Sequence, residues 1–231
     1  MSSAKWAEAL AAAAERLPVD AIGDALTTRS WWVGEDALPP EATAALAAEL
    51  DRLEDEDRLR RAGIGRETDY QIDRDIRRDR IRWLNRESPE QAAFLDFATT
   101  LRTALNRRLF LGLFEFEAHF ALYAEGAFYR THYDSFRGAA NRVVSLVAFL
   151  NPDWQPEHAG ELVLYADAQR DNETAEPVRI APRAGTLALF MSEEIPHEVL
   201  PTRAPRRSIA GWFRLCLLYT SDAADDLTRV D

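Results

Sequence analysis

The sequence predicts an α+β protein that is mainly β, in which helices from the N-terminal half support an antiparallel β-structure. Up to about residue 112, apolar side chains recur at spacings of three and four, as on amphipathic helices. From about Phe114 the spacing changes to two, and short strand-like segments separated by turn residues continue to about residue 215. This pattern favours a sandwich or barrel, and we expect one domain at residues 1–215.

Three helices are expected in the first half, with a short strand at residues 30–33 between the first two. The first helix has one apolar face, made by Trp6, Leu10, Ala14 and Leu17. The second begins after Pro39-Pro40 and ends at Gly63 and Gly65, because proline favours the first helical turn and glycine a helix end. The third follows Ser88-Pro89, where Gln91 completes a capping box.

The β-rich half, from about residue 113 to 215, opens with a strand that alternates between two sets of side chains. One set is apolar, namely Phe114, Phe116, Ala118, Phe120 and Leu122. Further strands are expected at residues 142–150, 161–165, 178–181, 186–190, 197–200 and 206–213. Turn residues, such as Asn151-Pro152-Asp153 and Gly160, separate them.

Composition excludes several classes of protein. The formal net charge of −11 argues against a broad nucleic-acid-binding surface, which needs clustered Lys and Arg. Cys216 is the only cysteine, so we expect neither a disulfide nor a cysteine-based zinc site, and the chain suits a reducing compartment. The sequence has no pattern of a membrane span or signal peptide. We therefore expect a soluble, cytoplasmic protein without nucleic-acid or membrane partners, and the sequence leaves its oligomeric state open.

Residues 216–231 differ from the rest of the chain, because they read like one frame of a transposase-type sequencing adapter. We interpret them as a non-native tail and leave them out of the fold prediction. A natural acidic tail is the alternative.

Two histidines and one aspartate form a candidate metal site. An extended backbone places His132 and Asp134 on one face, because side chains alternate along a strand. His197 follows Pro196 at the start of another predicted strand. Two imidazoles and one carboxylate can occupy one face of an octahedron and leave three positions open, which is the pattern of non-haem Fe(II) oxygenases.

A candidate carboxylate site follows nine residues after His197. Arg206 and Ser208 share one side of a predicted strand, and the forked guanidinium suits a bidentate carboxylate partner. Trp212 lies on the same face. The alternative for Arg206 is a surface arginine in the basic run 203–207.

Six segments between residues 73 and 214 have the order and spacing of a known family. They are residues 75–83, 123–134, 149–154, 160–162, 196–199 and 206–212. Together they resemble the prolyl 4-hydroxylase group of 2-oxoglutarate oxygenases, and within it the EGL-nine type of prolyl hydroxylase. The resemblance implies a double-stranded β-helix, the jelly-roll or cupin-like fold, with iron at its open end and helices behind the larger sheet.

The resemblance also implies roles for individual residues. The iron ligands would be His132, Asp134 and His197. Arg206, with Ser208, would hold the distal carboxylate of 2-oxoglutarate, and Tyr123 would lie beside the same co-substrate. Fe(II), 2-oxoglutarate and O2 are thus expected, with ascorbate as a candidate reductant.

Three residues are candidates for substrate binding. Arg77 and Asp79 match a segment beside the loop that covers substrate in the EGL-nine type, and Trp212 is the third. His119 shares a face with Tyr123, and we interpret it as a structural or exposed histidine.

One departure from the family pattern is Phe149, which stands where animal EGL-nine enzymes have a tyrosine that helps hold the distal carboxylate. Phenylalanine has no hydroxyl, so anchoring of the co-substrate would rest on Arg206 and Ser208.

The resemblance implies hydroxylation of a C–H bond with release of succinate and CO2, and we expect a prolyl residue in a protein or peptide as the substrate. One alternative is a free amino acid or other small molecule. Another is a non-catalytic, cupin-like metal-binding module. Arg206 and Ser208 argue against the module, because a protein without turnover has no need of a carboxylate clamp there.

Overall fold

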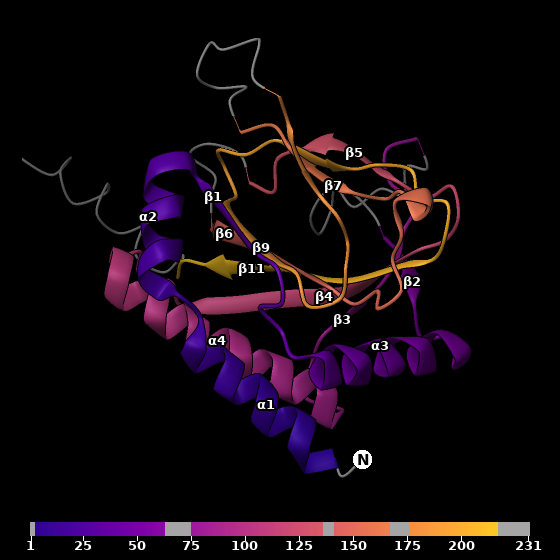
Figure 1. Cartoon of the computed structure of the whole chain (residues 1–231), viewed down its shortest axis with the longest axis horizontal. Helices are drawn as coiled ribbons and strands as arrows, with labels where there is room; N and C mark the ends of the chain where they lie inside the picture. The colour runs from indigo at the N-terminus through magenta and orange to yellow at the C-terminus, as the bar shows by residue number, and fades with distance from the viewer. Residues whose placement is uncertain (1–2, 63–74, 136–140, 167–175, 217–231) are drawn as a thin grey trace, which may run out of the picture.

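Two antiparallel sheets face each other, and helices cover the outer face of the larger one (Figure 1). The structure is a computed structural model that describes residues 3–62, 75–135, 141–166 and 176–216. The larger sheet has the strand order β1-β9-β6-β11-β4-β3-β2, and the smaller has the order β5-β10-β7-β8. This is the arrangement that was predicted, a double-stranded β-helix supported by helices.

The helices come from the first half of the chain. They are α1 (Ser3–Arg16), α2 (Val19–Arg29), α3 (Pro40–Asp55) and α4 (Pro89–Leu109). None of these described helices combines the length and the hydrophobicity that crossing a membrane requires. Helices α1, α3 and α4 lie under the larger sheet in Figure 1.

The larger sheet draws strands from both halves of the chain. Its strands are β1 (Trp31–Gly34), β2 (Arg60–Arg61), β3 (Arg80–Trp83), β4 (Glu115–Tyr123), β6 (Arg142–Phe149), β9 (Leu187–Met191) and β11 (Arg206–Arg214). The smaller sheet contains β5 (Tyr129–His132), β7 (Leu162–Leu164), β8 (Val178–Ile180) and β10 (His197–Val199). The predicted strands of the second half are present within one or two residues of their expected ends.

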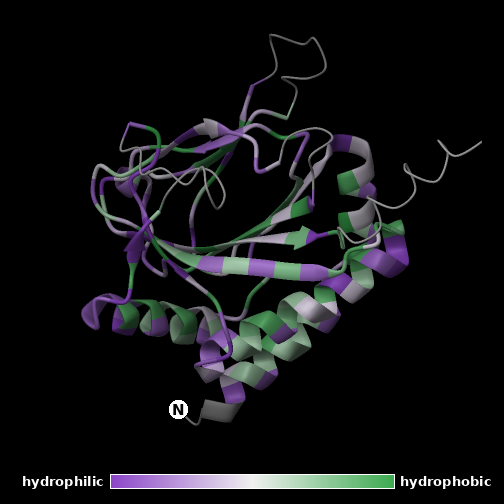
Figure 2. Cartoon of the chain, turned by 180° about the vertical axis from the view of Figure 1, so that it is seen from behind, coloured by the Kyte–Doolittle hydropathy of each residue, from purple (hydrophilic) through white to green (hydrophobic). Residues whose placement is uncertain are grey.

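The strands of the larger sheet divide their side chains between two cores. Phe120 and Phe213 lie on the helix side and pack with residues such as Phe94. Tyr123 and Phe149 lie on the opposite side, in a second core between the sheets. Figure 2 shows hydrophilic and hydrophobic colours alternating along the long strand β4. The period of two therefore decides which residues can reach the space where the candidate site lies.

The first half is less purely helical than the sequence predicted. Strands β2 and β3 were not predicted, and α2 is a second short helix before the strand β1. The position predicted for the end of the second helix was also wrong. Helix α3 ends at Asp55, because Asp57 adopts a left-handed conformation (φ 52°) that turns the chain, while the amide of Arg58 donates to the carbonyl of Leu53 (2.9 Å). Gly63 and Gly65 lie outside the described residues.

The start of α4 was predicted correctly in part. Ser88 caps the helix, since its hydroxyl accepts a hydrogen bond from the amide of Gln91 (3.3 Å). The predicted capping box does not form. Instead, the Gln91 carboxamide accepts from the amide of Asn85 (3.0 Å) and donates to Glu49 (2.8 Å), so it links α4 to α3.

Phe94→Ala is expected to lower the free energy of unfolding by about 3–5 kcal/mol, because Phe94 is fully buried and stacks on Phe97 at 5.7 Å. Phe110→Ala is the matched control, since Phe110 is 88% exposed and its loss removes little burial. Urea unfolding of the two variants measures the difference. Equal losses would contradict the packing described for α4.

Candidate active site

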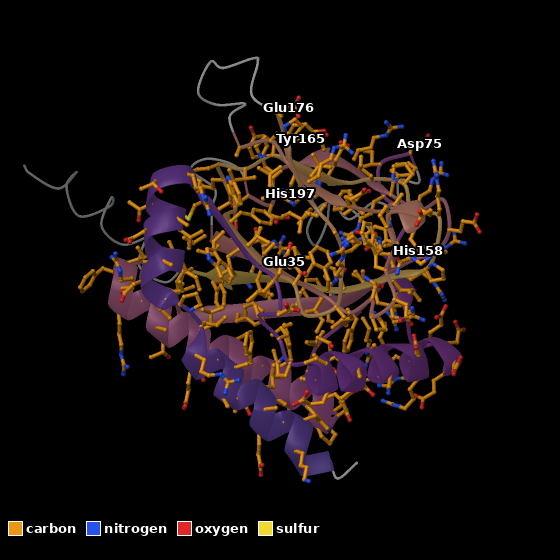
Figure 3. All side chains as sticks on the ribbon, in the orientation of Figure 1. Glu35, Asp75, His158, Tyr165, Glu176 and His197 are labelled. Atoms are coloured by element: carbon orange, nitrogen blue, oxygen red, sulfur yellow. The ribbon has the colours of Figure 1, made fainter. Side chains whose placement is uncertain are left out.

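The candidate metal ligands converge between the two sheets. His132 is the last residue of β5, Asp134 follows two residues later, and His197 opens β10, directly opposite His132 in the pairing of the strands. One donor atom from each lies within 4.8 Å of the other two. The Nε2 atoms of His132 and His197 lie 3.6 and 3.5 Å from the Asp134 carboxylate oxygens. Figure 3 shows His197 in the space between the sheets.

Backbone carbonyls fix the orientation of both imidazoles. Nδ1 of His132 lies 2.8 Å from the carbonyl oxygen of Arg130, and Nδ1 of His197 lies 3.1 Å from that of Ile195. A carbonyl only accepts, so Nδ1 carries the proton in each ring and Nε2 keeps its lone pair for a ligand. Burial lowers the pKa of His197 to about 4, although Asp134 opposes this, so the neutral, ligating form prevails at neutral pH.

Aromatic rings pack against both imidazoles. The ring of Tyr129 stacks on His132, with a centroid distance of 3.6 Å and an interplanar angle of 18°. Phe190 packs on His197 at 4.6 Å with a tilt of 60°. The two ligands are thus held by hydrogen bonds at one edge and by ring contacts at their faces.

One serine, Ser145, holds the carboxylate of Asp134, and a second serine contacts its hydroxyl. The Ser145 hydroxyl donates to Oδ2 of Asp134 (2.6 Å) and lies 2.9 Å from the hydroxyl of Ser192, and both serines are buried. Burial by itself would raise the pKa of Asp134, but the imidazoles of His197 and His132 and the bond from Ser145 hold it well below its usual range. The carboxylate is therefore ionised and oriented as a metal ligand requires.

Ser145→Ala is expected to weaken binding of Mn(II), a stable stand-in for Fe(II), by about 10-fold, because it frees the Asp134 carboxylate. Calorimetric titration of the metal-free protein measures this. Ser208→Ala is the control, since the Ser208 hydroxyl bonds Arg206 instead. If Ser145→Ala binds Mn(II) with unchanged affinity, Ser145 does not support the metal site.

Arg206 places a second polar side chain, besides the candidate metal ligands, in the space between the sheets. Its guanidinium is buried, donates from Nε to the carbonyl of Gly160 (2.7 Å), and donates from Nη1 to the hydroxyl of Ser208 (3.1 Å). Its Cζ lies 4.9 Å from the ring of Tyr123 and 5.1 Å from that of Phe149. Among the described residues, no carboxylate forms an ion pair with Arg206.

A buried cation without a counter-ion is costly, so this arrangement is suited to an anion that arrives with a ligand. Burial lowers the pKa of Arg206, with partial compensation from Tyr123 and Asp79, but a guanidinium stays protonated in proteins. Burial also raises the pKa of Tyr123, so its phenol stays neutral and can donate a hydrogen bond. Phe149 offers only its ring.

Two of the three candidates for substrate binding, Arg77 and Trp212, contact His119, and the roles of all three stay predictions. Arg77 and Asp79 form a buried ion pair, with Nε to Oδ1 at 2.6 Å. Trp212 packs on His119 with 5.5 Å between ring centroids, and Cζ of Arg142 lies 3.7 Å from the centroid of the Trp212 ring. The indole Nε1 of Trp212 is buried and has no hydrogen-bond partner among the described residues.

Sequence reasoning missed Tyr129, Ser145 and Phe190. Tyr129 is three residues before His132, so simple alternation puts the two rings on opposite faces; a register shift between β5 and β10 brings them together instead. A signal did exist for Ser145, since it is the one polar side chain within the apolar run 143–149. No pattern in the sequence pointed to Phe190.

Comparisons with known proteins agree with this geometry. Residues 118–214 match the 2OG-Fe(II) oxygenase superfamily. A prolyl-4-hydroxylase of known structure from Pseudomonas putida is 39% identical, with 85% of this chain and 98% of that chain covered and a TM-score of 0.77.

Two further structures share the fold. A prolyl hydroxylase from Trichoplax adhaerens, solved with a hypoxia inducible factor oxygen degradation domain peptide fragment, is 24% identical, with 87% and 90% of the chains covered and a TM-score of 0.74. A prolyl 4-hydroxylase from Phytophthora capsici is 21% identical, with 100% and 72% covered and a TM-score of 0.71. By its identity to the Pseudomonas protein over nearly the whole of that chain, this protein belongs to the 2OG-Fe(II) oxygenase superfamily and, within it, to the prolyl hydroxylase type.

Proposed function

We propose that this 2-oxoglutarate-dependent dioxygenase hydroxylates a prolyl residue in a protein or peptide and releases succinate and CO2. Members of its family use Fe(II) as the cofactor and 2-oxoglutarate and O2 as co-substrates. The observation that carries the proposal is that a buried Arg206, which forms no ion pair among the described residues, lies in the space between the sheets with two imidazoles and a carboxylate that converge on one point. That pair of sites matches a ferrous ion and a dicarboxylate co-substrate.

The donor set fits the metal. His132 and His197 would each offer Nε2 and Asp134 a carboxylate oxygen, which is the set of donors that ferrous ion takes in non-haem oxygenases. When bound, the ferrous ion supplies the activation of O2 that is coupled to oxidation of 2-oxoglutarate. One oxygen atom goes to the substrate C–H bond and the other to succinate, so the reaction balances without a further reductant.

The protein's own contribution is position and electrostatics. Arg206 would pair with the distal carboxylate of 2-oxoglutarate, with the hydroxyl of Ser208 and the neutral phenol of Tyr123 beside it. Fixing the far end of the co-substrate directs its near end toward the metal. Phe149 packs on the guanidinium and helps exclude water from it.

A protein or peptide substrate is supported by two kinds of observation. The Trichoplax structure holds a peptide, and the Pseudomonas protein carries the name of a prolyl-4-hydroxylase. In this chain, the large aromatic side chains of Trp83 and Tyr133 are 47% and 38% exposed, and Tyr133 stands between two proposed ligands. An exposed aromatic ring such as that of Tyr133, next to two proposed ligands, suits an apolar pyrrolidine ring.

The test is oxygen-dependent release of succinate from 2-oxoglutarate by the iron-loaded protein, with and without cell extract. We expect extract to stimulate release and a tryptic peptide to gain one oxygen atom on proline, as read by mass spectrometry. If a free amino acid stimulates succinate release and gains the oxygen atom itself, the proposed substrate is wrong, although the proposed type of reaction stands.

We also propose that residues 1–215 form one domain and that 216–231 are a non-native tail. In support, the helix-side core joins residues from Leu10 to Phe213, and the amide of Leu215 still donates to the carbonyl of Asn141 (2.7 Å). Residues 217–231 lie outside the described part. A chain ended at residue 215 should melt within about 2 °C of the full chain; a large fall would show that the tail is part of the fold.

A further inference from the structure

We infer that Arg77 and Asp79 act on the metal centre, by holding the ring of Tyr129 against the imidazole of His132. Arg77 and Tyr129 are then positioning residues for a metal ligand. The inference rests on the proposed function, since it takes His132 as a ligand. It gives Arg77 and Asp79 a role other than contact with substrate.

The ion pair of Arg77 and Asp79 is enclosed. Two guanidinium nitrogens of Arg77 donate to the two carboxylate oxygens of Asp79, at 2.6 and 2.8 Å. The side chain of Asp79 is 0% exposed and that of Arg77 is 11% exposed. Burial by itself would lower the pKa of Arg77, but Asp79 raises it above its ordinary value, so the guanidinium stays charged. A pair so enclosed has little charge to offer a substrate.

A buried histidine fixes the same guanidinium from another side. Nη2 of Arg77 lies 3.4 Å from Nε2 of His119, whose Nδ1 lies 3.1 Å from the carbonyl oxygen of Phe120. The carbonyl requires a proton on Nδ1, so Nε2 of His119 is the acceptor for Arg77. Burial, with the nearby charge of Arg77, lowers the pKa of His119 to about 4 and keeps this acceptor form.

The fixed guanidinium lies over Tyr129, and Tyr129 lies on His132. Cζ of Arg77 is 4.6 Å from the centroid of the Tyr129 ring, which is 3.6 Å from the centroid of the His132 ring at an angle of 18°. Cation–π and stacking contacts of this kind restrict the tilt of the middle ring. A continuous packed path therefore runs from Asp79 through Arg77 and Tyr129 to His132.

His132 needs this support more than His197 does. The side chain of His132 is 18% exposed and lies at the end of β5, which is one of the two edge strands of the smaller sheet. The side chain of His197 is 6% exposed, and its strand pairs with neighbours on both sides. The ring with the weaker enclosure is the one on which Tyr129 stacks.

The backbone around Arg77 closes the open side of β5. The amide of Arg78 donates to the carbonyl of Phe128 (3.1 Å), and that of Arg130 donates to the carbonyl of Ile76 (2.9 Å). A few residues later the same segment becomes β3 and pairs with β4 of the larger sheet. Residues 76–83 thus join the strand that carries His132 to the sheet that carries Tyr123 and Arg206.

The test measures binding of Mn(II) to the metal-free protein by calorimetry, with the visible absorption of bound Co(II) as a report on ligand geometry. Arg77→Met with Asp79→Leu removes the ion pair as a unit and leaves no unpaired buried charge. Tyr129→Leu removes the stacked ring and leaves the ion pair. We expect each to weaken Mn(II) binding by about 10-fold and to alter the Co(II) spectrum.

Tyr129→Phe is the matched control, since it keeps the ring and should keep the affinity within about twofold of the parent, well inside the 10-fold expected for loss of support. Thermal melting shows whether each variant is folded. If the double variant is unfolded, Tyr129→Leu alone tests the inference. Folded variants that bind Mn(II) like the parent would overturn the inference, as would a change confined to the KM for a protein substrate. His132→Ala tests the ligand set separately: if it binds Mn(II) normally, the proposed function fails as well.

Discussion

Replacing His132 with alanine is expected to abolish turnover of 2-oxoglutarate. The change removes one of three donors and leaves Asp134 and His197 to hold the ion. Loss of a partner that only orients a ligand costs roughly 10–100-fold in metal affinity, so loss of a ligand should cost more. Succinate release and anaerobic titration with Fe(II) measure the two effects in the same preparation.

The matched control is His158→Ala. The His158 side chain accepts a hydrogen bond from the amide of Gln155 in the turn Pro156–His158 and contacts none of the three donors. This variant should bind iron and turn over like the parent. Stoichiometric iron together with robust decarboxylation of 2-oxoglutarate in His132→Ala would remove His132 from the ligand set.

Arg206→Ala is expected to raise the KM for 2-oxoglutarate by about 100-fold while Fe(II) affinity is kept. A hydrogen-bonded pair of opposite charges contributes about 1.5–3 kcal/mol, and burial places this one at the upper end. Removing the guanidinium also leaves the carbonyl of Gly160 and the hydroxyl of Ser208 without their donor. Steady-state kinetics with varied 2-oxoglutarate measure the rise.

Arg207→Ala provides the control for the loss of a positive charge next in sequence. Arg207 points to the other face of β11 and pairs with Asp51 of α3 (2.6 Å). Its removal should lower stability slightly and leave the KM for 2-oxoglutarate unchanged. Equal KM values in Arg206→Ala and the parent would show that the distal carboxylate binds elsewhere.

The parts of the fold that could be predicted are those set by local pattern. Alternation along β4 separates Phe120 from Tyr123, and the same rule on β11 puts Arg206 and Ser208 on one side. Ser88 before a proline marked the start of α4 correctly. Such patterns depend only on neighbours in the chain, so the sequence displays them directly.

Features that depend on distant partners could not be predicted. Gln91 leaves the capping box because its carboxamide oxygen accepts from the amide of Asn85, while its nitrogen donates to Glu49 on another helix. Strands β2 and β3 pair with each other at the edge of the larger sheet, and two residues of β2 give no periodic signal. The end of α3 depends on one residue in the left-handed conformation, Asp57, at a position where glycine is usual.

The candidate site shows the same division. The spacing of His132 and Asp134 predicted a shared face, and the two side chains do meet. The support of those ligands could not be predicted, since Tyr129 reaches His132 through a register shift and Ser145 reaches Asp134 from another sheet. Sequence reasoning named the residues that carry chemical groups, whereas the structure was needed to find the residues that hold them.

The most direct measurement is an anaerobic crystal structure with Fe(II) and 2-oxoglutarate, using anomalous scattering at the iron edge. We expect one iron bonded to His132, Asp134 and His197, and a carboxylate of 2-oxoglutarate paired with Arg206. Iron at any other position, or a co-substrate whose two carboxylates both lie away from Arg206, would contradict this expectation.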